Sequence, residues 1–119
     1  MEIGNSRTVY VVQVDNNKDL SDAKRYGNLR AVLGKPRKPY DTTSLISKAR
    51  RVLADWQPGD YILMIGDPTL CAVCMAIASE KDNIINVLSW DRDTFQYIPQ
   101  IWDFAQMSLG LEDFDTAED

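Results

Sequence analysis

Three largely apolar runs mark the chain, and each has the length of one strand. They are TVYVVQV at 8–14, YILMIG at 61–66 and IINVLSW at 84–90. Apolar, β-branched runs of this length are typical of strands that are covered on both faces in a parallel sheet. In a fourth run, NLRAVLG at 28–34, Leu29, Ala31 and Leu33 alternate with Arg30 and Val32, which predicts a short and half-exposed strand.

Helical periodicity separates these runs. Residues 40–60, YDTTSLISKARRVLADWQPGD, carry one apolar stripe at helical spacing, formed by Leu45, Ile46, Ala49, Val52, Leu53 and Trp56. Asp41 or Thr42 can cap the start of this helix, and Pro58 with Gly59 ends it. The segment 20–27, LSDAKRYG, is shorter. With Ser21 as a cap and Gly27 as a stop, it predicts one or two helical turns.

The last strands are joined by a tight turn. In WDRDTFQYIP, residues 90–99, a polar turn at 91–94 leaves no room for a crossover helix, so the flanking strands must pair antiparallel. Pro99 suits an edge strand, which can spare one backbone donor. The sequence therefore predicts a single α/β domain with a mixed, mostly parallel five-stranded sheet of order 2-1-3-4-5, two main helices and an antiparallel edge hairpin.

We expect this α/β domain to span residues 1–104 and an acidic C-terminal tail to span 105–119, where LEDFDTAED closes the chain. The composition, 45% hydrophobic and 26% charged over 119 residues, is that of one globular domain. No apolar run approaches the roughly 18–20 residues that cross a bilayer, and the N-terminus does not resemble a secretory signal. We therefore expect an intracellular protein with no membrane partner.

The chain has no histidine. This removes the usual general base, the commonest zinc ligand and the base of every Ser-His or Cys-His nucleophile pair. A zinc site would have to combine both cysteines with two carboxylates, an unusual ligand set. The sequence therefore predicts no metal and no cofactor, and it favours a binding protein over an enzyme.

Charge is distributed unevenly. Residues 1–56 hold 11 basic and 6 acidic side chains, a net charge of +5, whereas residues 57–119 hold 2 and 12, a net charge of −10. A basic loop at Lys35, Arg37 and Lys38 could contact phosphates. Because the whole domain is acidic, it has little long-range attraction for nucleic acid, and a nucleic-acid partner is not expected.

The segment IGDPTLCAVC at 65–74 resembles an enzyme loop, but each residue has a structural explanation. Asp67 is placed to cap the following helix and Pro68 occupies its first position, where a missing N–H costs nothing. One glycine is too few for a phosphate cradle. Cys71 and Cys74 lie inside the helix rather than at its cap, on an apolar stretch, which favours core packing over redox chemistry.

An alternative ligand site remains open at the carboxyl ends of the parallel strands. Asp15, Asp67 and Asp91 each follow a predicted strand, and Gly66 and Thr69 flank Asp67. Ligands of open α/β sheets bind at these ends, and three carboxylates could hold Mg²⁺. The alternative function is thus a small Mg²⁺- or nucleotide-dependent enzyme or binding domain. Against it, Asp is simply a favoured residue at caps and turns.

The stretches VYVVQVDNNKDLSDAKRYGNLRAVL, PGDYILMIGDPTLCAVCMAIA and VLSWDRDTFQYIP resemble small α/β accessory proteins of tailed bacteriophages. The resemblance covers about residues 9–100 and implies no catalytic residue. It implies a virus-encoded protein that acts in the host bacterial cytoplasm by binding a host or phage protein. The sequence does not decide the oligomeric state, and a homodimer formed through the edge strand is one of the alternatives.

The segment QMSLGL at 106–111 resembles the hexapeptide by which many proteins dock on the bacterial sliding clamp. By that resemblance Gln106 would hydrogen-bond in a small subsite, while Met107, Leu109 and Leu111 would enter apolar pockets; Met107 replaces the usual leucine. The other interpretation is that residues 101–111 pack onto the domain or a second copy.

Overall fold

The structure, a computed structural model, describes residues 7–106. Five strands form one sheet of order β2-β1-β3-β4-β5, with parallel pairs from β2 to β4 and an antiparallel pair between β4 and β5. The strands are β1 (Thr8–Val11), β2 (Asn28–Ala31), β3 (Tyr61–Leu63), β4 (Ile84–Asp91) and β5 (Gln96–Asp103). The helices are α1 (Thr42–Leu53), α2 (Pro68–Ser79) and the 3₁₀ helices η2 (Ser21–Tyr26) and η3 (Phe104–Gln106). The predicted fold class and strand order are confirmed.

Helix starts follow the predicted caps in two of three cases. The Asp41 carboxylate accepts from the Ser44 N–H at 3.2 Å, and the Asp67 carboxylate accepts from the Thr69 N–H at 2.8 Å. At η2 the expected cap was wrong. Ser21 is the first helical residue, and its N–H and hydroxyl both donate to Asp19 Oδ1, because the preceding carboxylate reaches these groups more directly.

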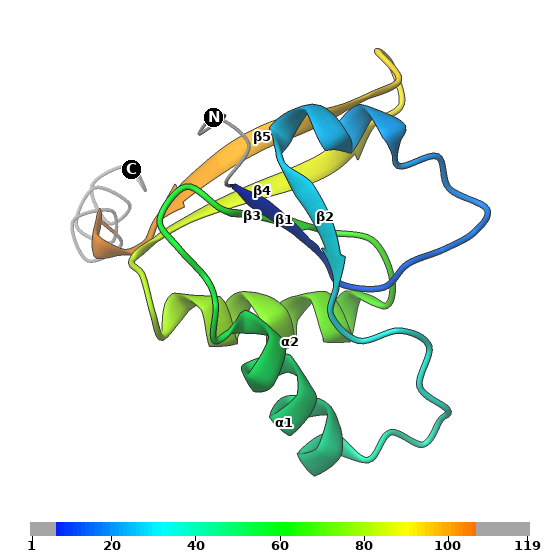
Figure 1. Cartoon of the computed structure of the whole chain (residues 1–119), viewed down its shortest axis with the longest axis vertical. Coiled ribbons are helices and arrows are strands. Elements are labelled where there is room, and N and C mark those ends of the chain that lie inside the picture. The colour runs from blue at the N-terminus through cyan, green and yellow to red at the C-terminus, as the bar shows by residue number, and fades with distance from the viewer. Residues whose placement is uncertain (1–6, 107–119) are drawn as a thin grey trace, which may run out of the picture.

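Both long helices cover the same face of the sheet (Figure 1). Right-handed crossovers require this, since the chain moves in the same direction across the sheet from β2 to β3 and from β3 to β4. We call this side the helical face. Its buried side chains come from alternate strand positions and from the two helices; they include Tyr10, Val12, Ala49, Leu53, Trp56, Ile62, Leu70, Cys74, Ile77, Ile85 and Val87.

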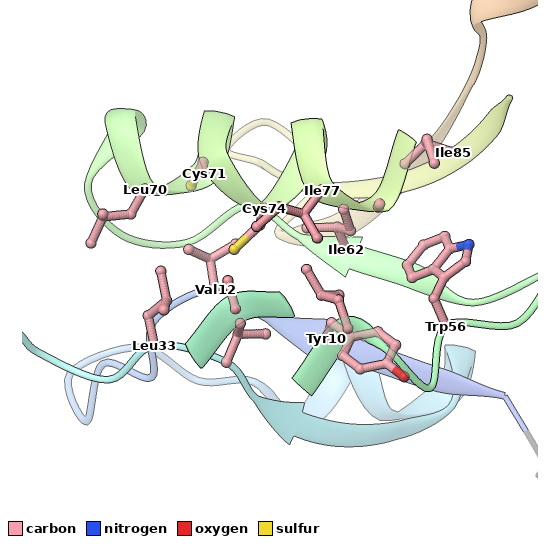
Figure 2. Close-up of a cluster of buried hydrophobic side chains, with 14 of the residues drawn as sticks. Tyr10, Val12, Leu33, Trp56, Ile62, Leu70, Cys71, Cys74, Ile77 and Ile85 are labelled. Atoms are coloured by element: carbon pink, nitrogen blue, oxygen red, sulfur yellow. The ribbon is translucent and has the colours of Figure 1, made fainter. Parts of the chain in front are cut away.

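The two cysteines belong to this core. Cys74 is fully buried and Cys71 nearly so, and Figure 2 shows Cys74 between α2 and the strands near Val12 and Ile62. Both are free thiols. Burial raises the pKa of Cys71, and it raises the pKa of Cys74 to about 12. The prediction that these side chains pack as small hydrophobes is confirmed.

The opposite face, which we call the η2 face, is covered by a much smaller element. The crossover from β1 to β2 moves in the other direction, so its helix η2 lies across the sheet from α1 and α2 (blue in Figure 1). Ala23 of η2 is buried, together with strand side chains; these are Val9, Val11, Leu63, Ile65, Leu88 and Tyr97. Six helical residues therefore cover the whole second core.

Residues 19–26 also bind the outer edge of β5. The Tyr97 N–H donates to Asp22 Oδ2 at 2.8 Å, the Tyr97 carbonyl accepts from the Tyr26 hydroxyl at 3.1 Å, and the Tyr97 hydroxyl donates to the Asp19 carbonyl at 3.3 Å. We call this set the Tyr97 clamp. It joins segments more than 70 residues apart along the chain.

The Tyr97 clamp also protects the edge of the sheet. The Phe104 N–H donates to the Asn83 carbonyl, and bonded pairs alternate along an antiparallel ladder, so Tyr97, Pro99 and Ile101 direct their backbone groups outward. Tyr97 is already bonded and Pro99 has no N–H. Extension of the sheet by a second copy, one route to a homodimer, is opposed at both positions.

A buried carboxylate fixes the other end of the sheet. Asp60, 2% exposed, accepts from the Thr8 N–H at 2.9 Å and from the Gln57 N–H at 2.8 Å. It thereby ties the start of β1 to the loop that leads into β3.

The Tyr97 clamp makes stability dependent on pH. Its hydrogen bond from Tyr97, followed by the contact with Arg25, lowers the pKa of Asp22 below its usual value. A carboxyl with a depressed folded-state pKa stabilises the fold above its unfolded pKa of about 3.9, and this contribution disappears as pH falls through the folded value. Asp22→Ala should therefore lower the urea midpoint at neutral pH, and the difference from wild type should shrink below about pH 4.

The matched control is Asp93→Ala, an exposed turn residue whose carboxylate has no bond to another side chain within residues 7–106. Its urea midpoint should follow the wild-type value across the same pH range. Equal urea midpoints for wild type and Asp22→Ala at neutral pH would show that the Tyr97 clamp contributes nothing to stability.

The buried thiols should be unreactive in the folded protein. Because thiolate is the reactive species and both pKa values are raised, an aromatic disulfide reagent should label neither cysteine at neutral pH until the protein unfolds. In denaturant both should react at once. Labelling of the native protein at the rate of a free thiol would contradict this placement.

Candidate functional site

The loops that follow β1, β2 and β3 meet at the carboxyl edge of the sheet. One side chain joins all three: Gln13 donates through Nε2 to the Gly34 carbonyl at 2.6 Å and accepts through Oε1 from the Asp67 N–H at 2.6 Å. Gly66 has φ +121°, and a Cβ there would collide with the Gln13 side chain. Sequence analysis missed Gln13 because it lies within an apolar run.

The Asp67 carboxylate is bonded by residues of the neighbouring loops. Its Oδ2 accepts from the Tyr40 hydroxyl at 2.7 Å, and Lys38 Nζ lies 3.7 Å from the same oxygen. The Tyr40 hydrogen bond and then the Thr69 N–H lower the pKa of Asp67, and the same bond raises the pKa of Tyr40. With Asp67 and the Thr69 N–H bonded to each other, this helix start is occupied by the protein itself.

The other two carboxylates of the alternative ligand site also bond locally. Asp15 accepts from the Asn17 N–H at 2.9 Å, and Asp91 accepts from the Thr94 hydroxyl at 2.7 Å and the Asp93 N–H at 3.3 Å. Within residues 7–106, no group of three or more Cys, Asp or Glu is arranged to hold a metal ion. The structure thus gives Asp15, Asp67 and Asp91 separate local partners.

A pocket of about 430 Å³ does open at this edge, on the η2 face. Of the five residues in the alternative ligand site, it includes only Gly66. Its lining comes from the loop after β1, the end of β3 and the β4–β5 hairpin; the residues are Asn17, Lys18, Asp19, Met64, Ile65, Gly66, Trp90 and Tyr97. The rings of Trp90 and Tyr97 meet edge to face, with centroids 4.9 Å apart.

The β4–β5 hairpin also exposes large apolar side chains. Those with substantial exposure are Ile84, Trp90, Phe95, Ile101 and Trp102, and we call this set the hairpin surface. Phe95 and Ile101 are the most open, at 73% and 72%. The register pairs Ile101 with Asn86 and Trp90 with Tyr97, so Ile101 and Trp90 share the η2 face, whereas Trp102 lies on the other face.

Phe95 has an unfavourable backbone. Its φ of +55° is the left-handed conformation that closes the hairpin, where its N–H donates to the Asp91 carbonyl at 2.8 Å. Glycine or asparagine adopts this conformation readily, whereas other residues pay roughly 1–2 kcal/mol. The sequence shows a polar turn here but gives no sign that its last residue is a strained, exposed aromatic.

The predicted docking segment falls largely outside the described residues. Gln106 is the last residue of η3, and Met107, Leu109 and Leu111 lie beyond residue 106, as does most of the predicted acidic tail. Docking on the bacterial sliding clamp through this segment therefore remains a prediction from the sequence.

Among the helices of residues 7–106, none has both the length and the apolar character needed to cross a membrane.

Comparison with known proteins identifies one family. The model of the family described as Phage Pam3 gp32-like protein matches residues 7–104, a range that contains every strand and both long helices. No curated protein and no solved structure matches the chain. The match confirms the resemblance to small phage accessory proteins, and the chain belongs to the Phage Pam3 gp32-like family.

Proposed function

We propose that this phage protein is a non-catalytic accessory protein, which binds a host or phage protein through the hairpin surface in the host bacterial cytoplasm. The observation that carries the proposal is Phe95. Its positive φ is unfavourable for phenylalanine, and 73% of the residue is exposed, so apart from an edge contact with the Trp90 ring it buries little within the protein. Strained and exposed residues of this kind concentrate at functional sites, and aromatic side chains supply much of the energy of protein interfaces.

The rest of the hairpin surface supports the same function. Five of the seven exposed large apolar side chains among the described residues belong to it; only Val14 and Ile46 lie elsewhere. A single element that exposes several large apolar side chains is typical of an interaction site. Between 82 and 103 the chain carries four acidic side chains and one basic one. The surface is therefore complementary to an apolar patch on the partner that is bordered by Lys or Arg.

Binding also agrees with the chemistry of the described residues better than turnover does. Both thiols are buried in the core, and the carboxylates at the carboxyl edge are bonded to caps and turns. No histidine is present to act as a base. The two thiols and the carboxylates of Asp15, Asp67 and Asp91 thus have structural roles.

The sliding clamp is the specific partner that the sequence offers. Gln106, Met107, Leu109 and Leu111 follow Trp102 by only a few residues, so a docked hexapeptide would extend the hairpin surface along the chain. Burying each leucine of such a motif contributes roughly 1.5–3 kcal/mol, part of which is spent on ordering the segment. This second part of the proposal rests on the sequence alone.

The hairpin surface can be tested with matched variants. Phe95→Asn relieves the backbone strain, and Ile101→Thr keeps a β-branched residue in β5, so the double variant should remain folded. Ile46→Gln removes an exposed isoleucine from α1 as a control. A protein captured from a bacterial or phage-infected lysate by the wild-type protein is then purified, and its Kd is measured for each variant.

The double variant should raise this Kd by about tenfold or more, the loss expected for an aromatic anchor, and Ile46→Gln should leave it unchanged. Equal Kd values for wild type and the double variant would exclude the hairpin surface. In a separate arm, purified host sliding clamp is titrated against wild type and the Leu109→Ala, Leu111→Ala variant. If wild type does not bind the sliding clamp at about tens of micromolar, or if both proteins bind it equally, docking on the sliding clamp is excluded.

A further inference from the structure

The pocket on the η2 face has the features of a small-molecule site, and it shares one residue, Trp90, with the hairpin surface. Its volume of about 430 Å³ falls within the roughly 300–1,000 Å³ of small-molecule pockets. It also lies beside the position where the strand order reverses: the chain leaves β1 toward β2 on one side and leaves β3 toward β4 on the other. In open α/β sheets, ligands bind outside the carboxyl ends of the strands at such a point.

One wall of the pocket is apolar and aromatic. Met64 and Ile65 continue from the end of β3, and the Trp90 and Tyr97 rings come from the hairpin. The Tyr97 ring is fixed, because it is buried and its hydroxyl donates to the Asp19 carbonyl. Trp90 packs against it and is 43% exposed, so an indole surface is available to a planar ring.

The opposite side of the pocket offers hydrogen-bond donors. Lys18, Asn17 and Gly66 all line the pocket, and the Lys18 ammonium, the Asn17 side-chain amide and the Gly66 N–H have no hydrogen-bond or ion-pair partner within residues 7–106. The Asp19 carboxylate also belongs to the lining, but its Oδ1 already accepts from the N–H and the hydroxyl of Ser21. The unused polar groups are therefore a cation, two neutral donors and the Oδ2 atom of Asp19.

We propose that this pocket binds a small planar aromatic molecule with an anionic group, its ring stacked on Trp90 and its anion bound by Lys18, Asn17 and the Gly66 N–H. A nucleoside monophosphate and an aromatic carboxylate share this chemistry. The site differs from the predicted carboxylate site: it uses Gly66 but leaves Asp15, Asp67 and Asp91 in their local bonds. It shares Trp90 with the hairpin surface, whose test residues Phe95 and Ile101 are not part of the lining.

Three tryptophans make the test internally controlled. Trp90 lies in the pocket, Trp56 is buried on the helical face, and Trp102 is exposed to a similar degree as Trp90 but lies on the other face of the hairpin. The full chain is titrated with AMP, CMP, GMP and UMP in one arm and with indole-3-acetate in another. The indole N–H signals are followed by NMR.

At least one probe should shift the Trp90 signal with a Kd below about 1 mM, while the Trp56 and Trp102 signals stay in place. Trp90→Ala should raise that Kd by about tenfold or more and Lys18→Gln by a few fold, with the Lys18 effect weakening in salt. Trp102→Ala and Lys81→Gln are the matched controls and should have Kd values within about twofold of wild type.

The two arms separate the sources of the ligand. Binding of a mononucleotide assigns the pocket to a nucleobase, and binding of indole-3-acetate alone assigns it to an aromatic carboxylate. The proposal is overturned if no probe shifts Trp90 at millimolar concentration, if Trp102 shifts equally, or if Trp90→Ala binds as well as wild type. Ile101→Thr alone, which leaves the pocket lining and the Phe95 ring against Trp90 in place, should keep this binding, so failure here and failure of the protein-binding proposal can be distinguished.

Discussion

The second face of the sheet depends on the contact between η2 and Tyr97. Both long helices lie on the helical face, since right-handed crossovers leave no alternative for this strand order. The other core is closed by six residues of 3₁₀ helix, which alone could bury only a narrow strip of apolar surface. Hydrogen bonds between Tyr97 and residues 19–26 bring the outer strand and this short helix together. The same bonds occupy one position of the exposed strand edge, where Pro99 already lacks a donor.

The candidate sites follow from this unequal covering. At the carboxyl edge, Gln13 and Asp67 satisfy the loop ends internally, which leaves the helix start with no free N–H for an anion at Asp67 or Thr69. On the η2 face the cover is too short to extend over the ends of β3 and β4. The uncovered part forms the pocket at Trp90, and beyond the cover the hairpin exposes Phe95 in its turn and Ile101 toward its other end.

Much of the fold could be predicted because its determinants are local. Asp67 followed by Pro68 specifies a helix start wherever the helix lies, and an apolar run specifies a strand before its neighbours are known. The strand order then follows from crossover handedness and the short turn before β5. The Tyr97 clamp could not be predicted in this way, since Asp22 and Tyr97 are 75 residues apart and neither is unusual in its own segment. Gln13 could not be identified for the same reason, because its partners Gly34 and Asp67 lie in other segments. The positive φ of Phe95 could not be predicted either, because phenylalanine disfavours that conformation.

Hydrogen exchange at two amides of β5 tests the Tyr97 clamp most directly. The N–H groups of Tyr97 and Ile101 both point away from β4, so the sheet ladder protects neither. Within residues 7–106, only the Tyr97 N–H has an acceptor, the carboxylate of Asp22. The account predicts slow exchange at Tyr97 and fast exchange at Ile101 in the wild-type protein, with Tyr97 becoming as fast as Ile101 in Asp22→Ala while the amides of β4 stay protected. Equal exchange at the two amides in the wild-type protein, or unchanged protection of Tyr97 in Asp22→Ala, would contradict it.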